Sequence, residues 1–349
     1  MVVKEEPAGM PPNAQQEGVI DEPSDRHDTE HTAAESHVIP NPDRFILKWT
    51  PRPAARQTWD TSARKEPMPP RLNPTLRQRR IGTELRKMRE AAGLSTATLS
   101  RDLGIDRTQV SQIESAKVGV SPERLRSFAA ACKCMNLPLI EALESVIQDR
   151  SKGWWEEYRG TIPDGFLEVA ELEKSADSLM LWVVTHMPGP CQTISYASSV
   201  FGRLIPPIPR HELEARTTFR MQRKADLRRD QKPITCFIYE SVLWTRFGGT
   251  SILQEQLASL LEDSEQPWVT LRVVPFDIDT FPGAVENLTY AFGAVPELDT
   301  VEVESSRGPI YLDAASELSS YRSIFNRTES TALSENASRD LIRKIARNL

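Results

Sequence analysis

The feature that most constrains this chain is the segment 94–114, where two short helical stretches meet at a single glycine. Ser95 and Asp106, whose side chains can cap a helix N-terminus, precede the two stretches. Gly104 stands at the sharp turn between them, where a small residue that tolerates left-handed φ is needed. The apolar positions that lock the pair are Leu99, Leu103, Val110 and Ile113. This pattern predicts two crossed helices over 96–103 and 107–114.

The outward face of the second predicted helix carries polar side chains that suit nucleic acid. Because an α-helix fits the major groove of DNA, such side chains can reach base edges and phosphates. Arginine can pair with guanine and glutamine with adenine, and backbone N–H groups at a helix start can contact phosphate. The alternative is a face that is merely solvated. The candidate DNA-binding residues are Thr96, Arg107, Thr108, Gln109, Ser111, Gln112 and Lys117.

Charge is distributed unevenly along the chain. The 349 residues carry a formal net charge of −6, but residues 71–150 hold 14 Lys and Arg against 9 Asp and Glu. The segments before and after this one are acidic. One basic module between acidic neighbours is the distribution expected when a single module meets phosphate. Within it, Arg79, Arg80 and Arg86 could contact phosphate or could serve solubility alone, and the sequence leaves both open.

The helical pattern extends on both sides of this pair. Ile81, Leu85, Met88 and Ala92 recur at helical spacing before Gly93, which ends that helix. Further helices are expected from Ser121-Pro122 and from Pro138, since proline is favoured in the first turn. We therefore predict an all-α five-helix domain over residues 76–149.

Residues 1–75 are predicted to be a disordered tail. Residues 1–70 hold 11 of the 26 prolines and show no sustained helical or strand period, as in segments that cannot bury a core. Met68 stands just before the basic module. It is a candidate alternative start, in which case the tail is an optional extension.

Strand-like and helix-like stretches alternate after Asp149. Interleaved elements of this kind predict one α/β or α+β domain over 150–349. The strand-like runs cover 179–185, 234–240, 269–275, 288–292 and 301–303. The helix-like stretches cover 166–177, 210–230, 252–263, 314–327 and 334–349.

The basic module resembles a known family. The segment from Lys87 to Glu114, with Lys117 and Ser121-Pro122, is similar to the Cro/C1 or xenobiotic-response-element class of helix-turn-helix domain. The resemblance implies that Thr96 lies at the phosphate and base edge and that Arg107, Thr108 and Gln112 read bases. It also implies a buried pair, Arg89 and Glu114, between the first and third helices. The chain departs from the family at Ala116, where glycine is usual because the backbone turns left-handed.

The C-terminal half also resembles a family, the WhiJ-like regulators of actinomycetes. These are described as antitoxin-like or developmental regulators, often encoded beside a very small partner protein. The resemblance implies a cytoplasmic, nucleoid-associated protein. It rests on Trp154-Trp155-Glu-Glu-Tyr158, Pro188-Gly-Pro-Cys-Gln-Thr193, Val242-Leu243 with Gly248-Gly249, Gln256-Leu257 and Val273-Val-Pro-Phe276.

The sequence gives no reason to expect catalysis, a cofactor or a metal. Beyond the tail the histidines are His186 and His211, and neither stands in a Ser-, Cys- or metal-type signature. Cys132-x-Cys134 lacks the second pair of ligands that a structural zinc site needs, so we expect Cys132 to be a small buried residue. No stretch approaches the ~20 apolar residues of a membrane helix.

The function that these observations favour is sequence-specific transcriptional regulation. A module of this size usually needs a homodimer on double-stranded DNA to bind two half-sites. One alternative is an antitoxin-like protein whose C-terminal domain binds a small partner, with DNA binding for autoregulation. Another is a ligand-sensing regulator. The aromatic residues that could line a ligand pocket, or else form core, are Trp154, Trp155, Tyr158, Trp182 and Trp244.

Overall fold

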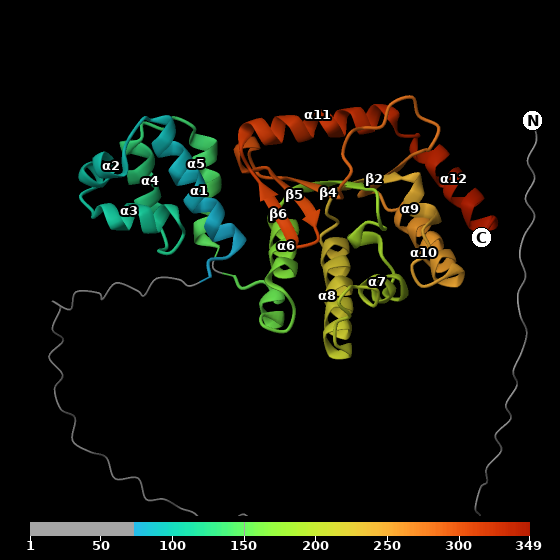
Figure 1. The fold of residues 1–349 in the computed structure, drawn as a ribbon. Helices are drawn as coiled ribbons and strands as arrows, with labels where there is room; N and C mark the ends of the chain where they lie inside the picture. The colour runs from blue at the N-terminus through green and yellow to red at the C-terminus, as the bar shows by residue number, and fades with distance from the viewer. Residues whose placement is uncertain (1–72, 150) are drawn as a thin grey trace, which may run out of the picture. The chain divides into compact units, whose positions relative to one another are not determined.

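The computed structural model describes residues 73–149 and 151–349. The predicted tail up to residue 72, with the alternative start at Met68, lies outside the described residues. The described chain comprises a helical region followed by a mixed α/β domain with a six-stranded sheet (Figure 1).

The helical region is built from short capped helices. Thr75 caps the first helix in a capping box with Gln78, and Ser95, Ser121 and Asn136 each accept a bond from a backbone N–H three residues later. Gly104, at φ 62°, ends the second helix. The helices are α1 (Leu76–Ala91), α2 (Thr96–Leu103), α3 (Arg107–Glu114), α4 (Pro122–Ala131) and α5 (Leu137–Gln148).

One apolar cluster holds these helices together. Its fully buried members come from all five helices, so no helix of the group buries its apolar stripe alone. Removing area of this kind from water stabilises by roughly 25 cal/mol per Å². The largest fully buried members are Leu85, Leu99, Leu125, Phe128 and Leu143.

The α/β domain contains more elements than its sequence pattern suggested. Its helical elements are η1 (Trp154–Tyr158), α6 (Asp164–Ser175), η2 (Gly189–Cys191), α7 (Ile194–Phe201), α8 (Arg210–Arg229), α9 (Glu240–Trp244), α10 (Thr250–Asp263), η3 (Pro296–Leu298), α11 (Ala315–Thr331) and α12 (Glu335–Arg347). Its strands are β1 (Ser178–Val183), β2 (Ile234–Tyr239), β3 (Val269–Val274), β4 (Leu288–Phe292), β5 (Thr300–Ser305) and β6 (Gly308–Leu312). The prediction omitted α7, α9 and β6.

The strand order is β3-β2-β1-β4-β5-β6. β1, β2 and β3 run parallel, whereas β4 is antiparallel to β1 and the β4, β5 and β6 strands alternate in direction. In this register Trp182 faces Leu288, and Leu288 faces Val303. The carboxyl ends of β1 and β5 therefore lie at the same edge of the sheet as the start of β4.

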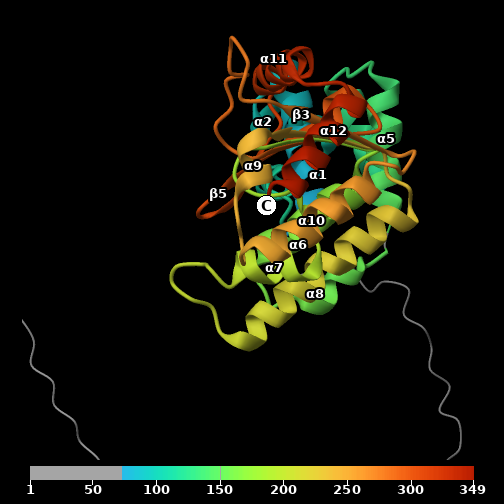
Figure 2. The same cartoon turned by 90° about the vertical axis from the view of Figure 1, so that its right-hand side faces the viewer.

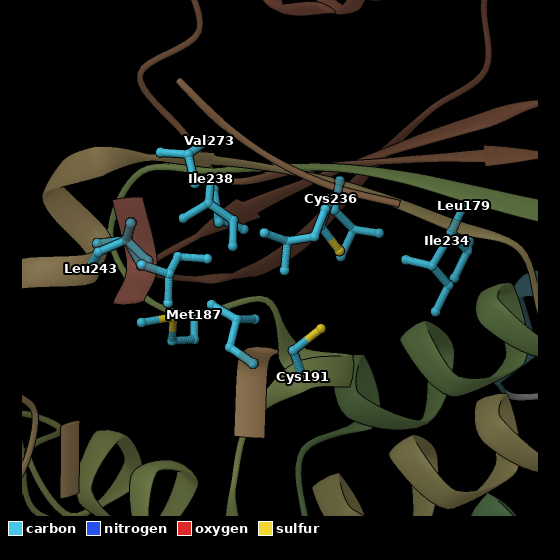
Figure 3. Close-up of a cluster of buried hydrophobic side chains, with 14 of the residues drawn as sticks. Leu179, Met187, Cys191, Ile234, Cys236, Ile238, Leu243 and Val273 are labelled. Atoms are coloured by element: carbon cyan, nitrogen blue, oxygen red, sulfur yellow. The ribbon is translucent and has the colours of Figure 1, made fainter. Parts of the chain in front are cut away.

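Helices cover both faces of this sheet. α6, α7, α8 and α10 lie on one face and α11 lies on the other (Figures 1 and 2). The first face holds the larger apolar cluster, in which Met187 and Cys191 from the loop after β1 pack beneath Cys236 and Ile238 of β2 (Figure 3). A second cluster joins Trp182 and Phe237 to Phe325 of α11. A three-layer domain results.

Candidate nucleic-acid interface

The turn between α2 and α3 has the tight geometry that a helix-turn-helix needs. At its start, Ile105 N–H donates to Ser100 O at 3.0 Å and Gly104 N–H donates to Arg101 O at 3.2 Å. Gly104 adopts the left-handed conformation that glycine accepts without a Cβ penalty. Leu99 of α2 and Val110 of α3 are fully buried beneath the turn. The opposite surface of α3 is therefore the one that remains available.

The candidate base-reading side chains lie on that available surface. Arg107, Thr108, Gln109 and Ser111 are exposed, and Gln112 is half-buried. Exposed polar side chains on one helix face are what direct readout in a major groove requires. The two phosphate candidates outside α3 also reach solvent, since Lys117 is exposed and Thr96 is half-buried.

Two of these candidates contact one another directly. Arg107 donates from Nε to Thr96 Oγ1 at 3.1 Å. Thr96 is the first residue of α2 and Arg107 the first of α3. The bond therefore links the starts of the two helices and orients the guanidinium on the exposed face.

Arg89 and Glu114 form a two-pronged ion pair. Arg89 Nε and Nη2 lie 2.6 and 3.0 Å from the two carboxylate oxygens of Glu114, and Nη1 donates to Leu94 O at 2.9 Å. Hydrogen bonding to Glu114, opposed by burial, raises the pKa of Arg89. Both side chains are about nine-tenths buried. The pair fixes α1 against the end of α3.

A glycine that the sequence analysis did not identify sets the distance between the same two helices. A Cβ on Gly82 of α1 would lie 2.6 Å from the backbone oxygen of Glu114 and 3.0 Å from that of Ile113. Real Cβ atoms do not approach a carbonyl oxygen so closely. The helical period around Ile81 and Leu85 gave no signal for it, because the constraint comes from a segment about thirty residues away.

Ala116 occupies a left-handed turn, as the resemblance implied. Its φ is 58°, and its side chain is buried at 3% exposure. A non-glycine residue in this region carries a cost of about 1 kcal/mol. The loop after α3 therefore turns left-handed at a non-glycine residue and stores this strain.

The structure shows the partners of the arginines at the start of α1, whose role the sequence left open. Arg79 Nη2 lies 2.6 Å from Glu168 of α6. Arg80 donates to Thr300 Oγ1 at 3.1 Å and to Asp299 O at 3.0 Å. These two side chains contact the α/β domain, so the structure favours neither of the roles that we considered for them. Arg86 is exposed and pairs with Glu90 at 2.7 Å.

Most of the aromatic side chains that could have lined a ligand pocket are core. Trp154 and Tyr158 pack around Phe219, at ring distances of 4.9 and 5.0 Å. Trp182 is fully buried and donates from Nε1 to Ala284 O. Trp155 alone of the five lines a cavity of about 240 Å³, together with polar residues of α1 and α6. Trp244 is 38% exposed.

Cys132 is buried in the helical core, and burial raises the pKa of its thiol to about 11. Among residues 73–149 and 151–349, we find no group of three or more His, Cys, Asp or Glu side chains placed to hold a metal ion. No helix in this part of the chain combines the length and the apolar character needed to cross a membrane.

Two families match the chain. Residues 80–143 match a helix-turn-helix domain. Residues 166–344 match a family described as a domain of unknown function, DUF5753. No curated protein and no solved structure matches the chain. The two matched ranges coincide with the helical region and with most of the α/β domain.

Proposed function

The chain belongs to the DUF5753 family and carries a helix-turn-helix domain, and from this premise we propose that it is a sequence-specific transcriptional regulator. The observation that carries the proposal is the exposed polar face of α3, with Arg107 oriented by Thr96. We assign base readout to Arg107, Thr108, Gln109, Ser111 and Gln112, and phosphate contacts to Thr96 and Lys117.

The resemblance to Cro/C1-type domains supports a homodimer on two half-sites about one helical turn apart, because one module of this size covers little DNA. The resemblance to WhiJ-like regulators supports an actinomycete protein that acts in the cytoplasm on the nucleoid. We propose that the protein acts by binding and not by catalysis.

The test is quantitative DNA binding by the full chain. Its sites are first selected from genomic DNA, and affinity is then measured for wild type and for Arg107→Ala. Loss of a base-reading arginine is expected to weaken specific binding about 10- to 100-fold and to relax the preference at one base position. Arg210→Ala, which removes an equally exposed arginine from α8, is the matched control. Unchanged specific binding by Arg107→Ala would refute the assignment of that residue.

A second candidate function is binding of a small partner protein by the α/β domain. Its support is two exposed aromatic residues on linked segments: Trp244 Nε1 and the backbone N–H of Phe276 both donate to the carboxylate of Glu240. Phe276 is 52% exposed. Aromatic side chains are enriched in protein interfaces. Co-purification from the native host tests this function, and a stoichiometric small protein that is lost with Phe276→Ser would support it.

A further inference from the structure

Arg220 of α8 is a cation without an anionic partner. Its Nη1 donates to Gln192 Oε1 at 3.0 Å, and its guanidinium lies 5.1 Å from the ring centroid of Phe201. Its Nε is enclosed and has no hydrogen-bond partner. Within the described part of the chain, no carboxylate lies within 4.0 Å of it. A partly buried charge in this state is costly, because Glu304, Glu173 and Glu302 stabilise it without a direct bond and do not offset its desolvation.

The other cationic side chains along the same stretch of α8 are all paired. Arg216 pairs with Glu212 at 2.5 Å, and Arg223 makes a two-pronged bond to Glu173 at 2.8 and 2.5 Å. Lys224 pairs with Asp263 at 2.9 Å. Arg220 therefore differs from its basic neighbours on α8, because it alone among them has no ion-pair partner.

The loop over residues 188–193 packs closely on Arg220 but does not bury it fully. A Cβ on Gly189 would lie 3.0 Å from Arg220 Nη1, so the backbone runs directly against the guanidinium. Gln192 is fully buried and is fixed by a bond from its Nε2 to Met187 O at 2.9 Å. Arg220 itself remains partly exposed to solvent. Nη1 of Arg220 is thus held in place, while small molecules can still reach the partly exposed side chain.

The position in the sheet is where open α/β domains bind ligands. The loop leaves the carboxyl end of β1, where the sheet changes from parallel to antiparallel pairing, and such switch points form crevices. Polar groups converge there: Asn287 Nδ2 donates to Glu304 Oε2 and to Thr185 Oγ1, each at 2.7 Å. His186 Nε2 lies 3.2 Å from Glu304 Oε1.

We propose that Arg220, together with the loop 188–193, binds a small oxyanion, the carboxylate or phosphate group of an effector molecule. Arginine suits such a group because its planar fork matches two oxygen atoms. Gln192 holds Nη1, one arm of the fork, and Nη2, which is neither bonded nor enclosed, is the donor left for the anion. This assignment names the class of ligand that the protein would bind if it is a ligand-sensing regulator. Any effect of that ligand on DNA binding rests on the proposed function.

Anion binding is measured without DNA, so its failure and the failure of the regulator proposal are distinguishable. The melting temperature of the full chain is recorded against sodium phosphate and, separately, sodium succinate, with chloride keeping ionic strength constant. We expect one of the two anions to raise it in a saturable way, by about 3 °C at ten times its Kd. A response to phosphate alone identifies a phosphorylated effector, and a response to succinate identifies a carboxylate.

Arg220→Gln should abolish the response, and Arg216→Gln, which removes a paired arginine one turn earlier, should retain it. The melting temperature and circular dichroism of Arg220→Gln without anion show whether this variant is folded. If its fold is impaired, Arg220→Lys, which keeps the charge and loses the fork, should respond at a several-fold higher anion concentration. An equal response from Arg220→Gln, or no saturable response of wild type to either anion up to 50 mM, overturns the proposal.

Discussion

Arg107 donates from Nε to Thr96 Oγ1 at 3.1 Å, which ties the first residue of α3 to the first residue of α2. The bond makes one side chain a positioning residue for another. Because the bond already orders the Arg107 side chain in the free protein, less side-chain entropy is lost when Arg107 binds DNA. Affinity gained in this way does not require a contact between Thr96 and DNA.

Thr96→Val tests that relationship, because it keeps the shape of the side chain and removes the acceptor. We expect specific DNA affinity to fall about 3- to 10-fold, in line with a net hydrogen bond of about 1 kcal/mol. The unfolding free energy should change by less than about 0.5 kcal/mol, since the site is at the surface. Affinity is measured by fluorescence anisotropy on the selected site. Thr245→Val, at an exposed threonine of the α/β domain, is the control, and equal affinities of the two variants would contradict the prediction.

Gly82→Ala should separate α1 from α3. The added methyl group would lie 2.6 Å from the Glu114 carbonyl oxygen, which is backbone and cannot rotate away. Overpacking of this kind costs about 1–3 kcal/mol. Chemical denaturation of the full chain, followed by circular dichroism, measures the loss. Thr83→Ala, at the next residue of the same helix, should cost much less, and comparable losses would argue that α1 does not approach α3 so closely.

Glu114→Gln should be strongly destabilising because it leaves Arg89 buried with a neutral partner. Breaking a buried pair from one side costs about 3–5 kcal/mol, and the retained amide should bring the loss toward the lower end of that range. The exposed pair of Arg86 and Glu90 offers the comparison, since solvent screens it and Glu90→Gln is expected to cost much less than Glu114→Gln. Both values come from urea denaturation, and similar values for the two variants would show that burial does not strengthen the inner pair.

These relationships divide into those that local sequence can predict and those that it cannot. The turn at Gly104 and the exposed face of α3 follow from the glycine and from apolar spacing within 20 residues. Asp106 stands at the N-cap of α3 as predicted, but its side chain makes no capping bond. Gly82 and the partners of Arg79 and Arg80 depend on segments distant in the chain, for which a single sequence has no pattern. Glycine and proline open β6 and weaken its strand signal, and α9, with five residues, is too short to show a helical period.

Arg220 shows the same limit for the α/β domain. In the sequence it is one of several basic residues of α8, spaced like its neighbours. Its difference appears when the partners are assigned, because Glu212, Glu173 and Asp263 are taken by the residues around it. A charge count cannot distinguish a paired cation from an unpaired one.

The stability of the α/β domain should decline as pH rises from about 4.5 to about 7. Glu302 of β5 is buried, and burial, with a contribution from Glu304, raises the pKa of its carboxyl to about 7 from a usual value of 4.5. The folded state therefore holds a proton that the unfolded state has released, and this contribution to stability is lost as pH rises through the folded pKa. The shift in the pKa of Glu302 corresponds to a loss of about 3 kcal/mol in the free energy of unfolding between the two pH values.

Two other groups near the end of β1, His186 and Glu304, also change the stability with pH, but in other pH ranges. His186, whose pKa is raised by Glu304 against the effect of burial, changes stability in the same direction at higher pH. Glu304 acts in the opposite direction at lower pH: despite burial, bonds from His186 and Asn287 lower its pKa to about 2, so its contribution is lost only as pH falls from 4.5 toward 2. Glu302→Gln keeps the side-chain shape without an ionisable group. Its unfolding free energy should fall less than that of wild type between pH 4.5 and 6.5, where the raised pKa of Glu171 still contributes, and should exceed that of wild type at pH 8, whereas a slope equal to that of wild type would show that another group titrates.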